Sequence, residues 1–143
     1  VDADVLNNSD AVLYYSEEPV DPLNYTMYTN KEIDLVLNEL STHIANADSL
    51  SKGRYVLSDE ITAVEDSINS VQSAIDSVES INPPDAYEDD REIILQRMTN
   101  AKDSLTSYLS ALKDDKTDDL SAYIDLMHGD YVALSGTFNM MWD

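Results

Sequence analysis

The two histidines of this chain, His43 and His128, each follow a carboxylate at helical spacing. Glu39 lies four residues before His43 and Asp125 three residues before His128, so each pair shares one face of a helix. Imidazole and carboxylate groups together are suitable ligands for zinc, iron or manganese. If the helices that carry the two pairs are antiparallel neighbours, the pairs lie at similar heights. One hypothesis is therefore a metal site formed by Glu39, His43, Asp125 and His128.

Other features of the sequence weigh against a metal site and against an enzyme. The Glu-x-x-His pair of di-iron bundles is absent, and both histidines are predicted to flank the apolar stripes of their helices. The acidic turn 114–119 lacks the ligand spacing and the central glycine of an EF-hand loop. The chain has no Gly-rich phosphate loop, no Gly-x-Ser-x-Gly elbow and no His-Glu-x-x-His motif. We therefore expect ordinary boundary histidines, no catalytic residues and no cofactor.

Four stretches that surround these residues carry apolar side chains at alternating steps of three and four. Stripes occur within 33–47, 94–112 and 120–141, and the clearest consists of Ile61, Val64, Ile68, Val71, Ile75 and Val78. Amphipathic helices bury such stripes against one another. The sequence therefore predicts an all-α protein, an antiparallel up-down-up-down four-helix bundle. It forms one domain over residues 29–143, with helices at about 30–50, 58–81, 85–113 and 118–141.

Local signals predict where these helices begin and end. Thr29 and Glu32 have the spacing of a capping box, which places the start of the first helix at Thr29. Gly53 is able to adopt the left-handed conformation that ends many helices. The Pro83–Pro84 pair ends the second helix, because the residue before a proline avoids helical dihedral angles. In the last helix, Gly129 and Gly136 indicate either a close approach of another segment or a local kink.

The first 28 residues contain no lysine or arginine and show no helical periodicity, which predicts an irregular arm. Tyrosines usually cover an apolar surface, so we expect the second half of the arm to lie on the bundle. Tyr14, Tyr15, Tyr25 and Tyr28 are the candidate partner-binding residues of this segment. The alternatives are packing of these tyrosines on the bundle and recognition of a peptide or a glycan.

The charge of the chain excludes several classes of partner. Its 29 acidic and 8 basic residues give a net charge of −21, which repels phosphate backbones and anionic lipid surfaces. We therefore expect no nucleic acid partner and, because no apolar run reaches the roughly 20 residues of a bilayer span, no direct membrane insertion. If the acidity is an adaptation to salt, the stability of the fold rises with ionic strength.

The chain begins at Val1 and has no cysteine. A start without methionine fits a mature or trimmed chain whose export signal has been removed. The lack of cysteine excludes disulfides and thiolate metal sites and is compatible with either side of a bacterial membrane. The compartment therefore stays open on these grounds alone.

The segment Asn82-Pro83-Pro84-Asp85-Ala86-Tyr87 opens a long helix that continues through Ala101-Lys102-Asp103-Ser104-Leu105. This arrangement resembles small extracytoplasmic helical-bundle lipoproteins of bacteria, most of which have no assigned activity. The resemblance covers mainly the second to fourth helices and implies an exported surface domain. The chain departs from the pattern at Arg91, where a histidine is frequent, and it has no lipid-bearing cysteine. No functional residue is carried over from the resemblance.

These observations favour a non-enzymatic, surface-exposed or secreted interaction or scaffold domain. The partner is a protein or a surface glycan, and weak homo-oligomerisation stays open. One alternative is the extracytoplasmic ligand-sensing domain of a receptor, against which the irregular arm counts. A metal-binding bundle that uses His43 and His128 is another.

Overall fold

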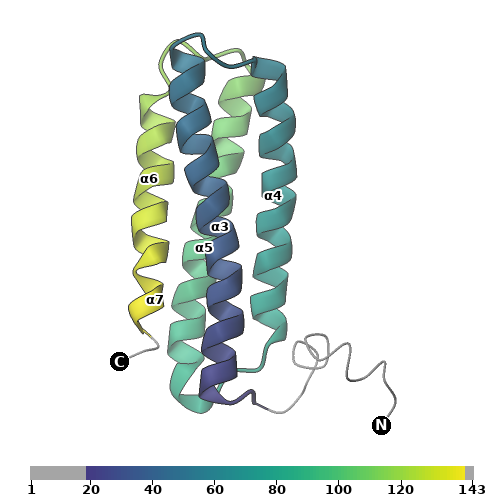
Figure 1. Cartoon of the computed structure of the whole chain (residues 1–143), viewed down its shortest axis with the longest axis vertical. Helices are drawn as coiled ribbons and strands as arrows, with labels where there is room; N and C mark the ends of the chain where they lie inside the picture. Colours follow the sequence, from purple (N-terminus) through teal and green to yellow (C-terminus); the bar gives the residue numbers. More distant parts are fainter. Residues whose placement is uncertain (1–18, 141–143) are drawn as a thin grey trace, which may run out of the picture.

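The computed structural model describes residues 19–140. Within this range the chain forms helices and no β-strand: α3 (Pro22–Ser51), α4 (Leu57–Ser80), the 3-10 turn η1 (Asp85–Tyr87), α5 (Glu88–Lys113), α6 (Ser121–Ser135) and the short α7 (Thr137–Met140). The four long helices pack against one another, as the four apolar stripes predicted (Figure 1). None of the described helices combines the length and the apolar character that a bilayer span requires.

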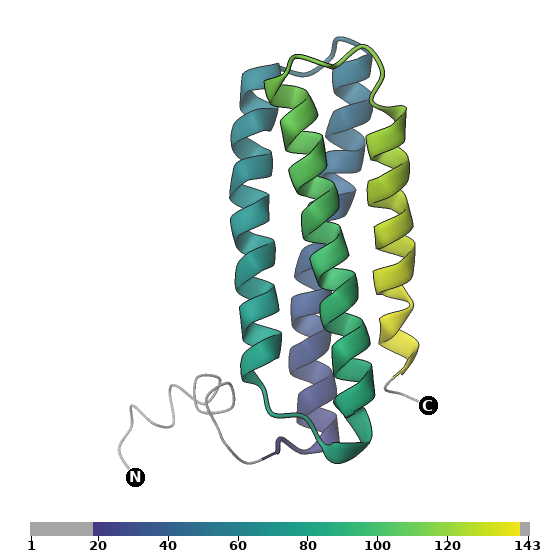
Figure 2. The same ribbon diagram turned by 180° about the vertical axis from the view of Figure 1, so that it is seen from behind.

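The helices surround a common core. Both α4 and α6 pack against α3 and α5, while α3 and α5 also touch across the middle. The α3–α4 and α5–α6 connections lie at one end of the bundle, and the α4–α5 connection lies at the other end (Figures 1 and 2). Each long helix therefore has one flank on each neighbour and one face toward solvent.

The first helix begins earlier than the sequence analysis predicted. Asp21 is the N-cap of α3, and its side chain accepts a hydrogen bond of 2.9 Å from the backbone N–H of Asn24. Pro22 follows at a position where its fixed φ and missing N–H fit the first helical turn. The capping box predicted at Thr29 and Glu32 is wrong, because both side chains are buried within the helix. The arm prediction is wrong for residues 22–28, which are helical, whereas residues 1–18 lie outside the described range.

The next two boundaries agree with the local signals. Gly53 has a φ of +69° directly after α3, in the left-handed region that only glycine adopts without strain. The backbone N–H of Arg54 then donates to Ser49 O at 2.8 Å, which satisfies one of the last carbonyls of the helix. Pro83 and Pro84 separate α4 from η1, and the acidic residues Glu88, Asp89 and Asp90 occupy the first turn of α5.

The last helix is shorter than predicted and is broken at Gly136. The helix α6 ends at Ser135 and the single turn α7 follows. Arg97 of α5 donates to Ala133 O at 3.0 Å beside the break. A Cβ at Gly136 would lie 3.3 Å from that same carbonyl, whereas a Cβ at Gly129 would meet nothing within 4 Å. Of the two readings of these glycines, a local break fits Gly136, and Gly129 faces open space.

The centre of the bundle is apolar along most of its length. Side chains from all four long helices are completely buried there: Ile33, Leu40, Val64, Val71, Met98, Leu105, Met127 and Leu134. Burial of one such side chain contributes roughly 1.5–3 kcal/mol, which makes this core the main source of stability. One level of the core is polar instead, because His43 and Glu60 are also completely buried.

Candidate functional site

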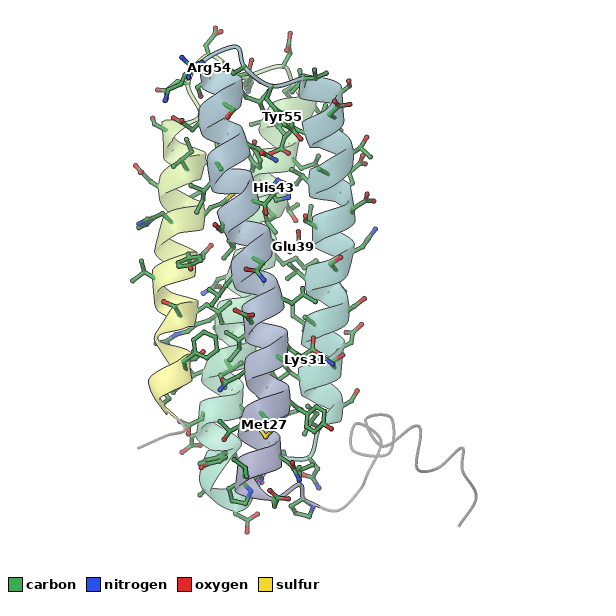
Figure 3. The ribbon with its side chains drawn as sticks, viewed as in Figure 1. Met27, Lys31, Glu39, His43, Arg54 and Tyr55 are labelled. Carbon is green, nitrogen blue, oxygen red and sulfur yellow. The ribbon has the colours of Figure 1, made fainter. Side chains whose placement is uncertain are left out.

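A buried polar network crosses the core between α3, α4 and α5. At its centre lies His43 of α3, which is 0% exposed. Its Nδ1 is 2.9 Å from Glu60 Oε2, and its Nε2 is 2.7 Å from Ser67 Oγ. Glu39 and His43 lie along the part of α3 that is next to α4 (Figure 3). The sequence analysis placed His43 at the boundary of the core, and this was wrong because α4 supplies partners for both ring nitrogens.

Glu60 is the acceptor that joins the three helices. Its Oε2 accepts from Tyr108 OH of α5 at 2.8 Å as well as contacting His43, and its Oε1 accepts from Asn46 Nδ2 of α3 at 2.9 Å. Glu60 also lies in the first turn of α4, where the positive end of the helix dipole favours a carboxylate. Three donors and a helix end thus offset the cost of burying this charge.

Ser67 continues the network to Glu39, which is half-buried at the side of the bundle. The Ser67 hydroxyl donates to Glu39 Oε2 in a short hydrogen bond. Because this hydroxyl has a single hydrogen, one proton arrangement has His43 Nε2 donating to Ser67 Oγ and Nδ1 donating to Glu60. That arrangement makes His43 an imidazolium between two carboxylates.

A second proton arrangement has the same heavy-atom positions. If Glu39 carries the proton and donates to Ser67, then Ser67 donates to a neutral His43. Glu39, His43 and Glu60 have charges of −1, +1 and −1 in the first arrangement and 0, 0 and −1 in the second, so both sum to −1. The two arrangements differ only by a proton shift along Glu39, Ser67 and His43.

Tyr108 closes the network on the α5 side. Burial raises the pKa of Tyr108 far above its ordinary value of 10.0, and the hydrogen bond to Glu60 and the charge of Glu60 raise it further. The phenol therefore stays protonated as a donor to Glu60. Its ring centroid is 6.3 Å from that of His43 and 6.4 Å from that of Tyr123 on α6. Aromatic packing thus extends the polar level to the fourth helix.

The order Ser67, His43 and Glu60 is that of a nucleophile, a base and an acid in hydrolytic triads. A nucleophile must reach its substrate, and backbone or side-chain donors must stabilise the oxyanion that forms. Ser67 is only 5% exposed, its hydroxyl faces Glu39, and its position inside α4 commits the neighbouring backbone N–H groups to the helix. The hydrogen bonds of this network link α3, α4 and α5.

The structure does not bring the four predicted metal ligands together. Glu39 and His43 belong to the buried network, whereas Asp125 and His128 are exposed on α6. Within residues 19–140, no group of three or more His, Cys, Asp or Glu side chains has an arrangement that could hold a metal ion.

The predicted tyrosine group is also divided. Tyr25 is 0% exposed, and its ring packs 5.9 Å from that of Tyr87. Tyr28 is half-buried against the core. Tyr14 and Tyr15 lie outside the described residues. The two described tyrosines are therefore part of the bundle, and the binding role proposed for Tyr14 and Tyr15 stays a prediction.

A second region with unusual side chains is the outer face of α6, which consists of Ala122, Leu126, Gly129, Val132 and Ala133. All five residues are exposed, and the two large ones, Leu126 and Val132, are 49% and 57% exposed. Only Met127 and Leu134 of this helix are fully buried among its described positions. The solvent side of α6 thus carries these apolar residues beside the exposed Ser121, Asp125 and His128.

Hollows lie on both flanks of this outer face. On the α3 side, a hollow of about 320 Å³ is lined by Ser41, Ile44, His128, Tyr131, Val132 and Ser135. Along α6 itself, a hollow of about 610 Å³ is lined by residues of this helix alone: Ala122, Asp125, Leu126, Gly129 and Asp130. A neighbouring hollow of about 310 Å³ is lined by Asn100, Asp103, Ser104, Ser107, Leu126 and Asp130. The hollow of about 310 Å³ lies between α5 and α6 and shares Leu126 and Asp130 with the hollow along α6, and we call the two together the α5–α6 groove.

Asp130 is the partly buried carboxyl of this groove. Burial raises the pKa of Asp130 above its ordinary value, and the nearby charge of Asp103 adds to this, while a hydrogen bond from the Ser104 hydroxyl opposes it. The carboxylate form of Asp130 is therefore held at a cost in free energy. A cation placed in the groove would remove that cost.

Comparisons of this chain with protein-family models, curated proteins and solved structures give no match. Its function is therefore inferred from its own residues and their geometry.

Proposed function

We propose that this chain is a non-enzymatic interaction or scaffold domain, surface-exposed or secreted, and that the outer face of α6 is its contact surface. The observation that carries the proposal is the exposure of Leu126 and Val132, at 49% and 57%, on a helix that also packs against the core. Contiguous apolar surface with a polar rim marks sites of interaction in soluble proteins. The antiparallel up-down-up-down order is part of the proposal, because it leaves α6 one free face between α3 and α5.

The contrast with α4 supports this assignment. The described part of α4 has no basic residue, and its exposed acidic residues are Asp59, Glu65, Asp66, Asp76 and Glu79. In α6 the acidic residues are Asp125 and Asp130 alone. A helix covered with like charges stays hydrated, whereas a helix with exposed leucine and valine gains free energy when a partner covers it.

The extracytoplasmic location is proposed on the resemblance to exported helical-bundle lipoproteins. The alternative of a ligand-sensing domain is favoured by one observation, the hollow between α3 and α6. At about 320 Å³, and with Ile44, Tyr131 and Val132 in its lining, it has the size and the apolar character that small ligands require.

Site-specific photo-crosslinking in the cells that produce the protein tests the contact surface. A photoreactive residue is placed at Leu126 or Val132 of α6 and, as a matched control, at the exposed Ser73 of α4. The proposal predicts a discrete crosslinked species from the two α6 positions and none from the control. The same products from all three positions, or none from α6, would contradict it.

A further inference from the structure

The α5–α6 groove is apolar along its floor and acidic along its rim. Leu126 lies in both of its hollows, and Ala122 and Gly129 extend the floor along α6. Carboxylates stand on both sides: Asp103 on α5 and Asp125 and Asp130 on α6. Neither lysine nor arginine is among the residues that line the two hollows. The groove therefore combines apolar contact area with uncompensated negative charge.

The nearby cations of α5 are engaged elsewhere. Lys102 Nζ is 2.6 Å from Gln72 Oε1 on α4, on the other side of α5. Arg97 contacts Ala133 O beside the break between α6 and α7. Within the described residues, the only hydrogen bond that the Asp130 carboxylate accepts from a side chain comes from the neutral Ser104 hydroxyl. Within the described residues, no lysine or arginine lines the hollows beside this carboxylate.

The shape of the groove favours a helix as the bound partner. One of its hollows lies between α5 and α6, the other lies along α6, and the helices that line them offer no strand edge. Grooves between helices accept the apolar face of an amphipathic helix. At Gly129 a Cβ would meet nothing within 4 Å, so a partner backbone has room to approach closely there. Packed helices lie roughly 8–10 Å apart, and small residues at the crossing favour the shorter distances.

The negative net charge of the chain favours a partner of positive charge. A second copy carries the same net charge of −21 and would add acidic residues to an acidic groove. A helix with lysine or arginine beside its apolar stripe would place cations against Asp103, Asp125 and Asp130 while covering Leu126. Such complementarity increases the association rate and excludes acidic partners.

We propose that the α5–α6 groove binds a basic amphipathic helix of another protein, with Leu126 as the apolar anchor and Asp130 as the main charged contact. This inference rests on the proposed interaction function and adds the chemical class of the partner.

The test uses a synthetic peptide of about 18 residues with leucines at helical spacing on one face and lysines elsewhere. A peptide of the same composition with its leucines scattered serves as the control for charge alone. Binding to the full chain is measured by calorimetry at physiological ionic strength. We expect the striped peptide to bind at least tenfold more tightly than the scattered one, because only the striped peptide covers Leu126.

Two matched pairs of variants locate the binding. Leu126→Ser is compared with Met27→Ser, which alters an exposed apolar side chain of α3, outside the outer face of α6. Asp130→Asn is compared with Asp66→Asn, which removes one exposed charge from α4. We expect Leu126→Ser to weaken binding about tenfold and Met27→Ser to weaken it much less. Asp130→Asn should weaken it several-fold more than Asp66→Asn does. Equal effects within both pairs would overturn the proposal, because they would show attraction by net charge alone.

Failure of this inference is distinguishable from failure of the proposed function. If the striped peptide does not bind but photo-crosslinking at Leu126 still captures a discrete species, the basic class of the partner is wrong and the interaction function stands. If crosslinking at both α6 positions yields nothing beyond the α4 control, the interaction function itself is wrong.

Discussion

The α3–α4–α5 network and the outer face of α6 both depart from the usual distribution of side chains, and they do so in opposite ways. In the network, charged groups lie where apolar groups are expected, with His43 and Glu60 both 0% exposed. On α6, apolar groups lie where polar groups are expected, with Val132 57% exposed. The network satisfies its polar atoms with partners inside the chain, whereas the described residues leave the outer face of α6 without a cover. The first arrangement serves the fold, and the second is available to a partner.

The largest loss of stability is expected when the acceptor at the centre of the network is removed. Glu60→Ala leaves His43, Tyr108 and Asn46 without their acceptor in a buried site. We expect the free energy of unfolding to fall by about 3–5 kcal/mol, as urea denaturation would measure. The matched control is Asp66→Ala on the exposed face of α4, which should change it by about 0.5 kcal/mol or less. Similar losses in both variants would mean that the network does not stabilise the fold.

Ser67 tests the connection between His43 and Glu39. Ser67→Ala removes the hydroxyl that bridges them and leaves His43 Nε2 unpaired, so a loss of about 1–3 kcal/mol is expected. Ser73→Ala on the solvent side of the same helix should be neutral or slightly stabilising, because alanine is the better helix former. Thermal and urea unfolding of the two variants would separate a loss of hydrogen bonds from a change in helix propensity.

The dependence of stability on alkaline pH tests the role of Tyr108. Its pKa in the folded chain is raised above 10.0, so the folded state keeps a proton that the unfolded state releases. Stability is therefore fully present below the ordinary tyrosine pKa and falls as pH rises above it, by about 1.4 kcal/mol per pH unit for each such tyrosine. Burial also raises the pKa of Tyr25, which contributes in the same direction.

In Tyr108→Phe, the loss of unfolding free energy per pH unit in the alkaline range should be smaller by the contribution of one tyrosine. Denaturation at a series of pH values above 10 measures it, with Tyr55→Phe as the control because Tyr55 is 39% exposed. An unchanged slope in Tyr108→Phe would contradict the protonated, Glu60-bound phenol.

The smallest expected effect is on the α6 side. A Cβ at Gly129 meets nothing within 4 Å, so Gly129→Ala should stabilise the isolated chain by about 1 kcal/mol. Gly53→Ala should do the opposite and cost about 1–2 kcal/mol, because Gly53 has a φ of +69°. Melting temperatures of the two variants provide the measurement. A loss of stability in Gly129→Ala would show that α6 is packed on its outer face after all.

Much of the architecture was predictable because it depends on local periodicity. The stripe from Ile61 to Val78 predicted α4 to within one residue at each end. The start of α3 was missed although a signal was present. Asp21 followed by Pro22 is an N-cap followed by a proline at the first helical position, and these outweigh the capping box at Thr29.

The network was missed for a different reason. Sequence spacing paired His43 with Glu39 on its own helix, whereas the decisive partners, Glu60 and Ser67, lie on α4. A signal for them existed, because Glu60, Val64, Ser67 and Val71 follow one another at steps of four and three on the core face of α4. Polar residues at core positions predict a buried network, but which helix supplies the other half depends on tertiary packing that spacing does not contain.

An NMR titration of the isotope-labelled chain with the striped basic peptide tests the central claim, that the outer face of α6 is the binding surface, most directly. We expect chemical shift changes at the amides of Ala122, Leu126 and Gly129 and at the facing positions Asp103 and Ser107 of α5. Much smaller changes are expected along the acidic face of α4. Changes of equal size at Glu65, Asp66 and Asp76 would contradict the claim, because the peptide would then be following net charge instead of the groove.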